Sequence, residues 1–144
     1  MEKNNTVPIG FINAIDILTK RSNLDYYRKI LEEVMEDTCF YCGRKFRRLR
    51  VEVDHVIPWS YIHNDNLWNL VLACRECNNN KRDSLPHRKY IGILICRNNH
   101  WQKNCLKLEK EMLAYNSRNI EGLYTYAENN GFTVGWLPKE YNLG

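Results

Sequence analysis

Apolar residues recur at helical spacing in the first and last parts of the chain and alternate with charged residues near its middle. Residues 22–37 carry apolar side chains three to four positions apart, which predicts an amphipathic helix. A shorter helix is expected before it, at the apolar positions Phe11, Ile12, Ile15 and Leu18. After Pro86 the helical spacing returns as far as Ala127, and Gly131 and Gly135 then end the helical pattern. Helices are therefore expected on both sides of the centre.

The central segment has a different pattern. Leu49, Val51 and Val53 alternate with charged residues, which predicts a strand or hairpin arm within residues 39–54. Residues 59–68 are rich in asparagine and aromatic residues and are expected to form a loop. A short apolar run at 70–72 follows, and a short helix is expected from about Cys77 to Lys81. The predicted fold class is α+β.

Composition places the chain among ordinary globular proteins. Its 144 residues are 44% hydrophobic and 26% charged, which excludes intrinsic disorder and suits one domain or two small ones. No apolar run approaches the 18 residues of a membrane span. The first residues, MEKNNTVPIGF, lack the apolar stretch of a secretory signal, so a cytoplasmic location is expected.

Six cysteines in a reducing compartment favour metal binding over disulfides. Four of them form two CxxC pairs with 31 residues between the pairs, and each pair offers two thiolates from one tight turn. Two such pairs predict a tetrahedral structural zinc site, which leaves no open position for a substrate. The remaining pair, Cys96 and Cys105, is expected to pack in the core. The predicted zinc ligands are Cys39, Cys42, Cys74 and Cys77.

Polar residues between and after the cysteine pairs suggest metal-assisted chemistry. Asp54 offers the hard oxygen that Mg²⁺ prefers, and the adjacent His55 is a side chain that acts as a base near neutral pH. Asn78 begins the helix after the second pair, and Lys81 follows one turn later, where it could meet a phosphate. An ion, a base and a cationic clamp together suit phosphodiester hydrolysis.

Positive charge is concentrated in the middle of the chain. The net charge of +4 is modest, but five of the seven residues at 44–50 are basic, and a second basic cluster spans 75–89. The first cluster is either a solvated hairpin or a contact to a DNA backbone, and the second reading is preferred. The expected DNA contacts are Lys81, Arg44, Lys45, Arg47, Arg48 and Arg50.

The pattern CxxC…VDHVIP…NLVLACxxCNxxK, from Cys39 to about Ser84, resembles the HNH endonuclease family, whose zinc-bearing members have a ββα-metal core. The resemblance implies that His55 is the general base and that Asp54 and Asn78 hold one catalytic Mg²⁺ or Mn²⁺. It implies that Asn69 is the middle residue of the family name, a brace that keeps His55 oriented. It also implies cleavage that leaves 5′-phosphate and 3′-hydroxyl ends.

The resulting hypothesis is a zinc-stabilised ββα-metal core at 39–85, flanked by helical segments at 1–38 and 86–144, that hydrolyses DNA. A non-catalytic zinc module that binds nucleic acid or protein is the alternative, and RNA as substrate is a third possibility. His63 is a weaker candidate for a catalytic or DNA contact. The flanking helices could bind a protein partner or a second copy of the chain.

Overall fold

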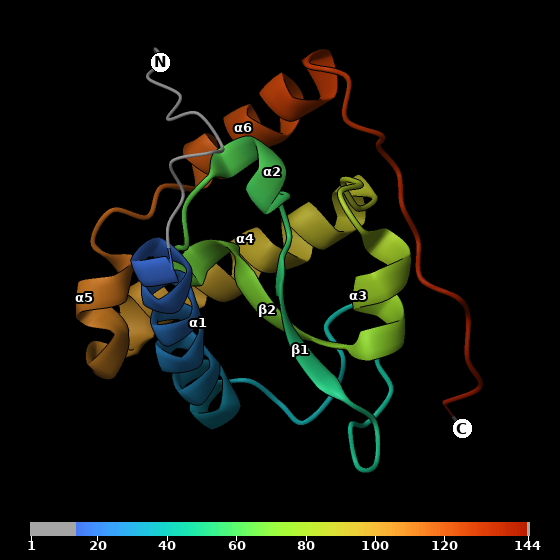
Figure 1. Cartoon of the computed structure of the whole chain (residues 1–144), viewed down its shortest axis with the longest axis horizontal. Helices are drawn as coiled ribbons and strands as arrows, with labels where there is room; N and C mark the ends of the chain where they lie inside the picture. The colour runs from blue at the N-terminus through green and yellow to red at the C-terminus, as the bar shows by residue number, and fades with distance from the viewer. Residues whose placement is uncertain (1–13, 144) are drawn as a thin grey trace.

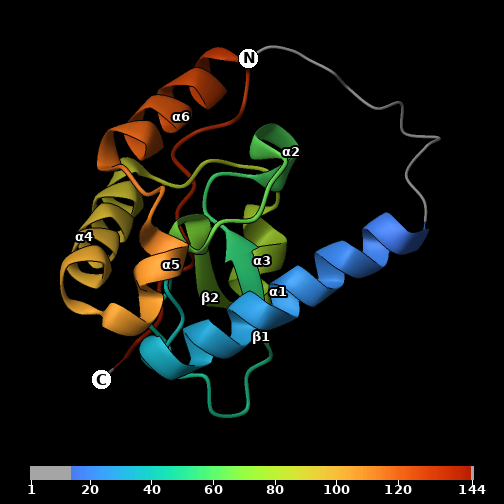
Figure 2. The same cartoon turned by 90° about the vertical axis from the view of Figure 1, so that its left-hand side faces the viewer.

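The computed structural model describes residues 14–143. In this part of the chain, helices surround one small antiparallel sheet of two strands, so the fold is α+β as the sequence predicts. The sheet lies between the first helix and the helix that follows the second strand, as the two views in Figures 1 and 2 show. The elements are α1 (Ala14–Val34), β1 (Val51–His55), α2 (Trp59–Ile62), the 3₁₀ turn η2 (Leu67–Asn69), β2 (Leu70–Cys74), α3 (Arg75–Lys81), α4 (Arg88–Asn104), the 3₁₀ turn η3 (Leu106–Leu108), α5 (Glu109–Met112) and α6 (Ser117–Asn129).

The strands β1 and β2 and the helix α3 form a continuous ββα unit. Val51 pairs with Cys74 at one end of the sheet, and His55 pairs with Leu70 at the other. The helix α3 begins directly after Cys74, whose sulfur accepts a hydrogen bond from the Cys77 amide and caps the helix. The register therefore places a cysteine at one end of the sheet and the Asp-His pair at the other.

All five residues of β2 are buried. The apolar run at 70–72 does not alternate because α1 and α3 cover the two faces of the sheet. Apolar side chains from α1, α4 and α6 join β2 in one core, which includes Leu31, Leu94, Trp101, Ile120 and Tyr124.

Three predictions of local structure were wrong in detail. The two N-terminal helices are one helix, α1, because no glycine or proline interrupts residues 14–34; Phe11 and Ile12 lie outside the described residues. The strand begins only at Val51. The hairpin lies earlier in the chain, where an antiparallel bridge between Thr38 and Lys45 closes a turn at Gly43, whose φ is 77°. Residues 59–68 are not all loop, because they contain α2 and the start of η2.

Cys96 was expected in the core but is exposed on α4, and Cys105 is partly exposed after that helix. Cys96 lies on the solvent side of α4, whereas Cys105 lies just past the end of that helix and packs against the core while partly exposed.

The helix α4 also fixes the chain ahead of β2. The Arg97 guanidinium donates to the Leu70 carbonyl at 2.8 Å and to the Leu67 carbonyl at 3.2 Å, while Asn98 donates to the Trp68 carbonyl at 2.7 Å. Burial lowers the pKa of Arg97, but its hydrogen bonds to these carbonyls favour the charged form. These bonds anchor the turn η2, which carries Asn69.

Arg97→Met should lower the free energy of unfolding by about 3 kcal/mol, because two carbonyls lose their charged hydrogen-bond partner. Urea denaturation measures the change. The control is Lys103→Met on the exposed side of the same helix, which should change stability by less than about 0.5 kcal/mol. Equal effects of the two substitutions would show that Arg97 does not anchor the turn.

Candidate metal centre and candidate active site

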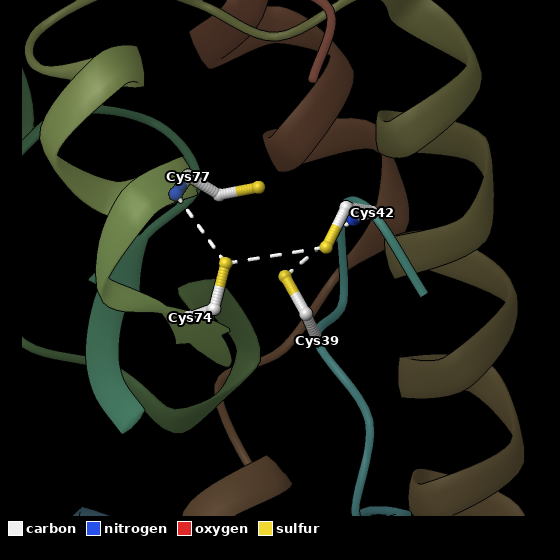
Figure 3. Close-up of side chains that lie close together, drawn as sticks. All are labelled: Cys39, Cys42, Cys74 and Cys77. Carbon is white, nitrogen blue, oxygen red and sulfur yellow. Dashed lines mark hydrogen bonds between the residues drawn. The ribbon is translucent and has the colours of Figure 1, made fainter. Parts of the chain in front are cut away.

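The four cysteines of the two CxxC pairs meet in space (Figure 3). Their sulfur atoms all lie within 4.8 Å of one another, and the Cys42 and Cys74 sulfurs are 4.0 Å apart. Tetrahedral zinc with Zn–S bonds of about 2.3 Å requires sulfur separations of about 3.8 Å. The amides of Cys42 and Cys77 point at the first sulfur of each pair, at 3.5 and 3.4 Å. The donor set and its spacing fit a structural zinc ion.

The four thiols alter one another's protonation. The Cys77 thiol hydrogen-bonds to Cys39, which lowers the pKa of Cys39 to about 4 and raises the pKa of Cys77. Burial raises the pKa of Cys74. Four thiolates this close would repel one another, so a bound cation is needed for all of them to ionise.

Arg44 is part of this centre. Its guanidinium lies 3.4 Å from the sulfurs of both Cys42 and Cys74, pairs with Glu76 at 2.9 Å and stacks 3.7 Å from the Tyr141 ring. The hydrogen bond to Cys42 is the main reason that the pKa of Arg44 is raised. Arg44 was expected to contact DNA, whereas the structure engages its guanidinium with the sulfurs. The other four basic residues of this cluster are exposed: Lys45, Arg47, Arg48 and Arg50.

Purified protein should contain one zinc per chain by elemental analysis, and removal of zinc by a strong chelator should unfold the core, because zinc binding and folding are linked. Cys74→Ser should lose the metal and much of the soluble protein. Cys96→Ser, at an exposed cysteine outside the cluster, is the matched control and should keep both. Folded wild-type protein without zinc would contradict this assignment.

At the other end of the sheet, Asp54 faces α3 and is 6% exposed. Its Oδ2 accepts a hydrogen bond from the Tyr41 hydroxyl at 2.5 Å and lies 3.3 Å from the Lys81 ammonium. Burial and the neighbouring Asp54 raise the pKa of Tyr41 well above its ordinary value, so Tyr41 remains a donor.

Lys81 is fully buried and also donates to the His55 carbonyl at 2.9 Å. Lys81 was predicted to contact a phosphate, and its burial argues against that role. The ammonium instead ties the end of α3 to the end of β1. The CNNNK sequence gives no sign of this, because the inward direction of Lys81 depends on how α3 packs.

His55 follows Asp54 in β1, but its side chain contacts Asp65 instead of Tyr41 and Lys81. Its Nε2 lies 2.6 Å from Asp65 Oδ1, and both side chains border a cavity of about 230 Å³ together with Leu24 of α1 and Trp59 of α2. Asp65 was not among the predicted site residues, because it lies ten residues after His55 in a loop and belongs to no recognised motif. His63 is exposed, with its ring against Trp59 in an edge-to-face contact.

Asn69 is 1% exposed and binds the chain just beyond His55. Its Oδ1 accepts from the Ile57 amide and its Nδ2 donates to the Ile57 carbonyl, both at 2.9 Å. The Asn69 carbonyl also accepts from the Val56 amide at 2.9 Å. These three bonds fix the direction in which the chain leaves β1.

Asn78 is partly exposed on α3, one turn before Lys81. Residues at this spacing share a face of a helix, so Asn78 lies on the side of α3 that approaches Asp54. Within the described residues, the Asn78 side chain forms no hydrogen bond to Asp54 or to His55.

A two-stranded antiparallel sheet, a following helix and a four-cysteine centre together define a ββα domain with a candidate zinc site. Residues 39–87 match a protein-family model described as HNH endonuclease. The match confirms the resemblance and covers about a third of the chain. A search of curated proteins gives no match. Among the described residues, no helix is long and apolar enough to cross a membrane.

Proposed function

We propose that this chain is a metal-dependent HNH endonuclease that hydrolyses phosphodiester bonds in DNA. The observation that carries the proposal is the family match over 39–87, which contains the cysteine cluster, Asp54, His55, Asn69 and Asn78. Within the matched segment, Asp54 and His55 lie together at the end of β1.

In this proposal His55 is the general base. It takes a proton from water, and the resulting hydroxide attacks phosphorus in line with the departing 3′ oxygen. Asn69 orients His55 indirectly, because its two bonds to Ile57 hold the backbone that follows β1.

Asp54 and Asn78 are the proposed holders of one Mg²⁺ or Mn²⁺, because a carboxylate and a carboxamide offer the oxygen ligands these ions prefer. When bound, such an ion would neutralise charge on the scissile phosphate and the leaving oxygen. Tyr41 and Lys81 both contact Oδ2 of Asp54, which leaves Oδ1 to face a cation. The nearby Lys81 charge offsets that of the carboxylate, so a weak site that requires millimolar metal is expected.

The exposed basic residues between the first cysteine pair and β1 are the proposed contacts to the phosphate backbone: Lys45, Arg47, Arg48 and Arg50. Such contacts provide affinity without sequence information. DNA is the proposed substrate and RNA is the alternative, and cleavage assays on both nucleic acids test the choice. The segments 1–38 and 86–144 are proposed to set partner or homodimer contacts.

A non-catalytic zinc module remains the alternative function, and one observation favours it. Asp54 already has an ammonium partner, as a residue with a purely structural role would. Incubation of purified protein with supercoiled plasmid in Mg²⁺, Mn²⁺ or EDTA separates the two functions. The nuclease produces nicked or linear DNA only with the added ion, whereas the binding module leaves the plasmid intact in every condition.

His55→Ala should reduce cleavage by about 10²–10⁴-fold, the contribution typical of a general base. Binding to DNA, measured by fluorescence anisotropy, should change little, because phosphate contacts provide most of the affinity. His100→Ala, at an exposed histidine of α4, is the control and should cleave normally. If His55→Ala keeps more than about a tenth of the wild-type rate, His55 is not the base.

Asn78→Ala should raise the Mg²⁺ concentration needed for half-maximal cleavage, because one of two protein ligands is lost. Zinc content should stay the same, since the four cysteines are untouched. Asn79→Ala, at the exposed neighbouring position, provides the matched control. An unchanged Mg²⁺ response in Asn78→Ala would remove this residue from the metal site.

A further inference from the structure

The contact between His55 and Asp65 joins the end of β1 to the loop between α2 and η2. The 2.6 Å distance from Nε2 to Oδ1 is that of a strong hydrogen bond to a charged group. Both side chains are largely buried, with 14% of the His55 side chain and 9% of the Asp65 side chain exposed. A contact that is short and shielded from water is stronger than an exposed ion pair.

The loop that carries Asp65 is itself held in place. His63, at the end of α2, has a left-handed backbone with φ of 58°, and its amide donates to the Trp59 carbonyl at 2.8 Å. On the other side of Asp65, the Asn66 carbonyl accepts from the Asn69 amide at 2.9 Å. Asp65 therefore lies between two hydrogen-bonded turns that fix its position relative to the His55 imidazole.

We propose that Asp65 is a positioning residue that holds His55 with its proton on Nε2, which leaves the lone pair of Nδ1 to accept a proton from water. The inference rests on the proposed function and deepens it. The neutral imidazole donates Nε2–H to Asp65, so Nδ1 is the nitrogen without a proton.

The proton balance follows from this arrangement. Water gives one proton to Nδ1, its oxygen forms the new bond to phosphorus, and the bond from phosphorus to the 3′ oxygen breaks. The leaving oxygen keeps the electron pair and takes a proton from solvent. The imidazolium formed at His55 is stabilised by the Asp65 carboxylate, which remains ionised, as in other histidine–carboxylate pairs.

The geometry around Nδ1 agrees with this role. Within the described residues, no hydrogen bond to Nδ1 is found, whereas Nε2 has the carboxylate. The ring borders the cavity of about 230 Å³ that Leu24 and Trp59 also line. Among the residues that line this cavity, Asp65 is the one for which the structure shows a hydrogen bond to the His55 ring.

Long-range proton–nitrogen NMR on ¹⁵N-labelled, zinc-bound protein at about pH 8, where an ordinary histidine is neutral, tests the inference without any cleavage assay. The His55 signals are identified by their loss in His55→Ala. The wild-type protein should show Nε2 protonated, with a downfield proton that exchanges slowly with water. Asp65→Ala and the isosteric Asp65→Asn should lose that slowly exchanging proton. Asp37→Ala, at an exposed aspartate, should retain it.

Cleavage kinetics supply the second measurement. Asp65→Ala and Asp65→Asn should lower kcat by at least about tenfold, but by less than the 10²–10⁴-fold expected for loss of the base itself. KM for DNA should change by less than about twofold, because Asp65 does not contact the backbone. Unchanged kcat in both variants would overturn the positioning role.

Different results would contradict the proposed nuclease function and the proposed role of Asp65. If neither the wild-type protein nor any variant cleaves DNA, the nuclease proposal fails, and the NMR result alone decides whether Asp65 fixes the His55 tautomer. A wild-type spectrum with the proton on Nδ1, or with no change in Asp65→Ala, overturns the inference even if the protein is an active nuclease.

Discussion

The position of four sulfur atoms constrains the rest of the domain. Their convergence joins a loop before the sheet to the junction of β2 and α3, although 31 residues separate the two cysteine pairs. Because Cys74 pairs with Val51, fixing its sulfur also fixes where β1 begins. The antiparallel register then carries that constraint along five residues to His55. A cation bound among the sulfurs would thus constrain the geometry of the candidate site at the opposite end of the sheet.

At that end, Asp54 and His55 point to opposite faces of the sheet, because successive side chains of a strand alternate. Asp54 turns toward α3 and meets Tyr41 and Lys81, whereas His55 turns toward α1 and α2 and meets Asp65. The buried Lys81 links the two sides, because it contacts both the Asp54 carboxylate and the His55 carbonyl. The arrangement gives each of the two adjacent residues its own hydrogen-bond or ion-pair partners, and none of these partners is adjacent in sequence.

Local sequence patterns predict the parts of the fold that depend on interactions between residues close together in the chain. CxxC spacing predicts a metal centre because two cysteines in one turn point the same way, and apolar periodicity identifies most of the helices. The burial of Lys81 and the contact of Asp65 with His55 depend on how distant segments pack, and a single sequence carries no periodic signal for either. Arg44 illustrates the same limit: a run of basic residues predicts surface charge, while one member turns inward to the sulfurs.

The segments outside the family match contribute to the centre of the molecule. Arg97 and Asn98 of α4 bind three carbonyls of the segment that carries Asn69, and α1 supplies Leu24 beside His55. The ββα unit is thus braced by helices on both sides, which explains how so small a sheet keeps a fixed geometry.

The chemistry of the product ends tests the central claim most directly. If His55 activates water for attack on phosphorus with the 3′ oxygen leaving, each nick in a plasmid carries a 5′-phosphate and a 3′-hydroxyl. DNA ligase alone should then reseal plasmid nicked by this protein in Mg²⁺, restoring closed circles without prior treatment of the ends. Nicks that ligase cannot seal until the ends are repaired would contradict the mechanism, and the absence of nicks in every metal would contradict the nuclease function itself.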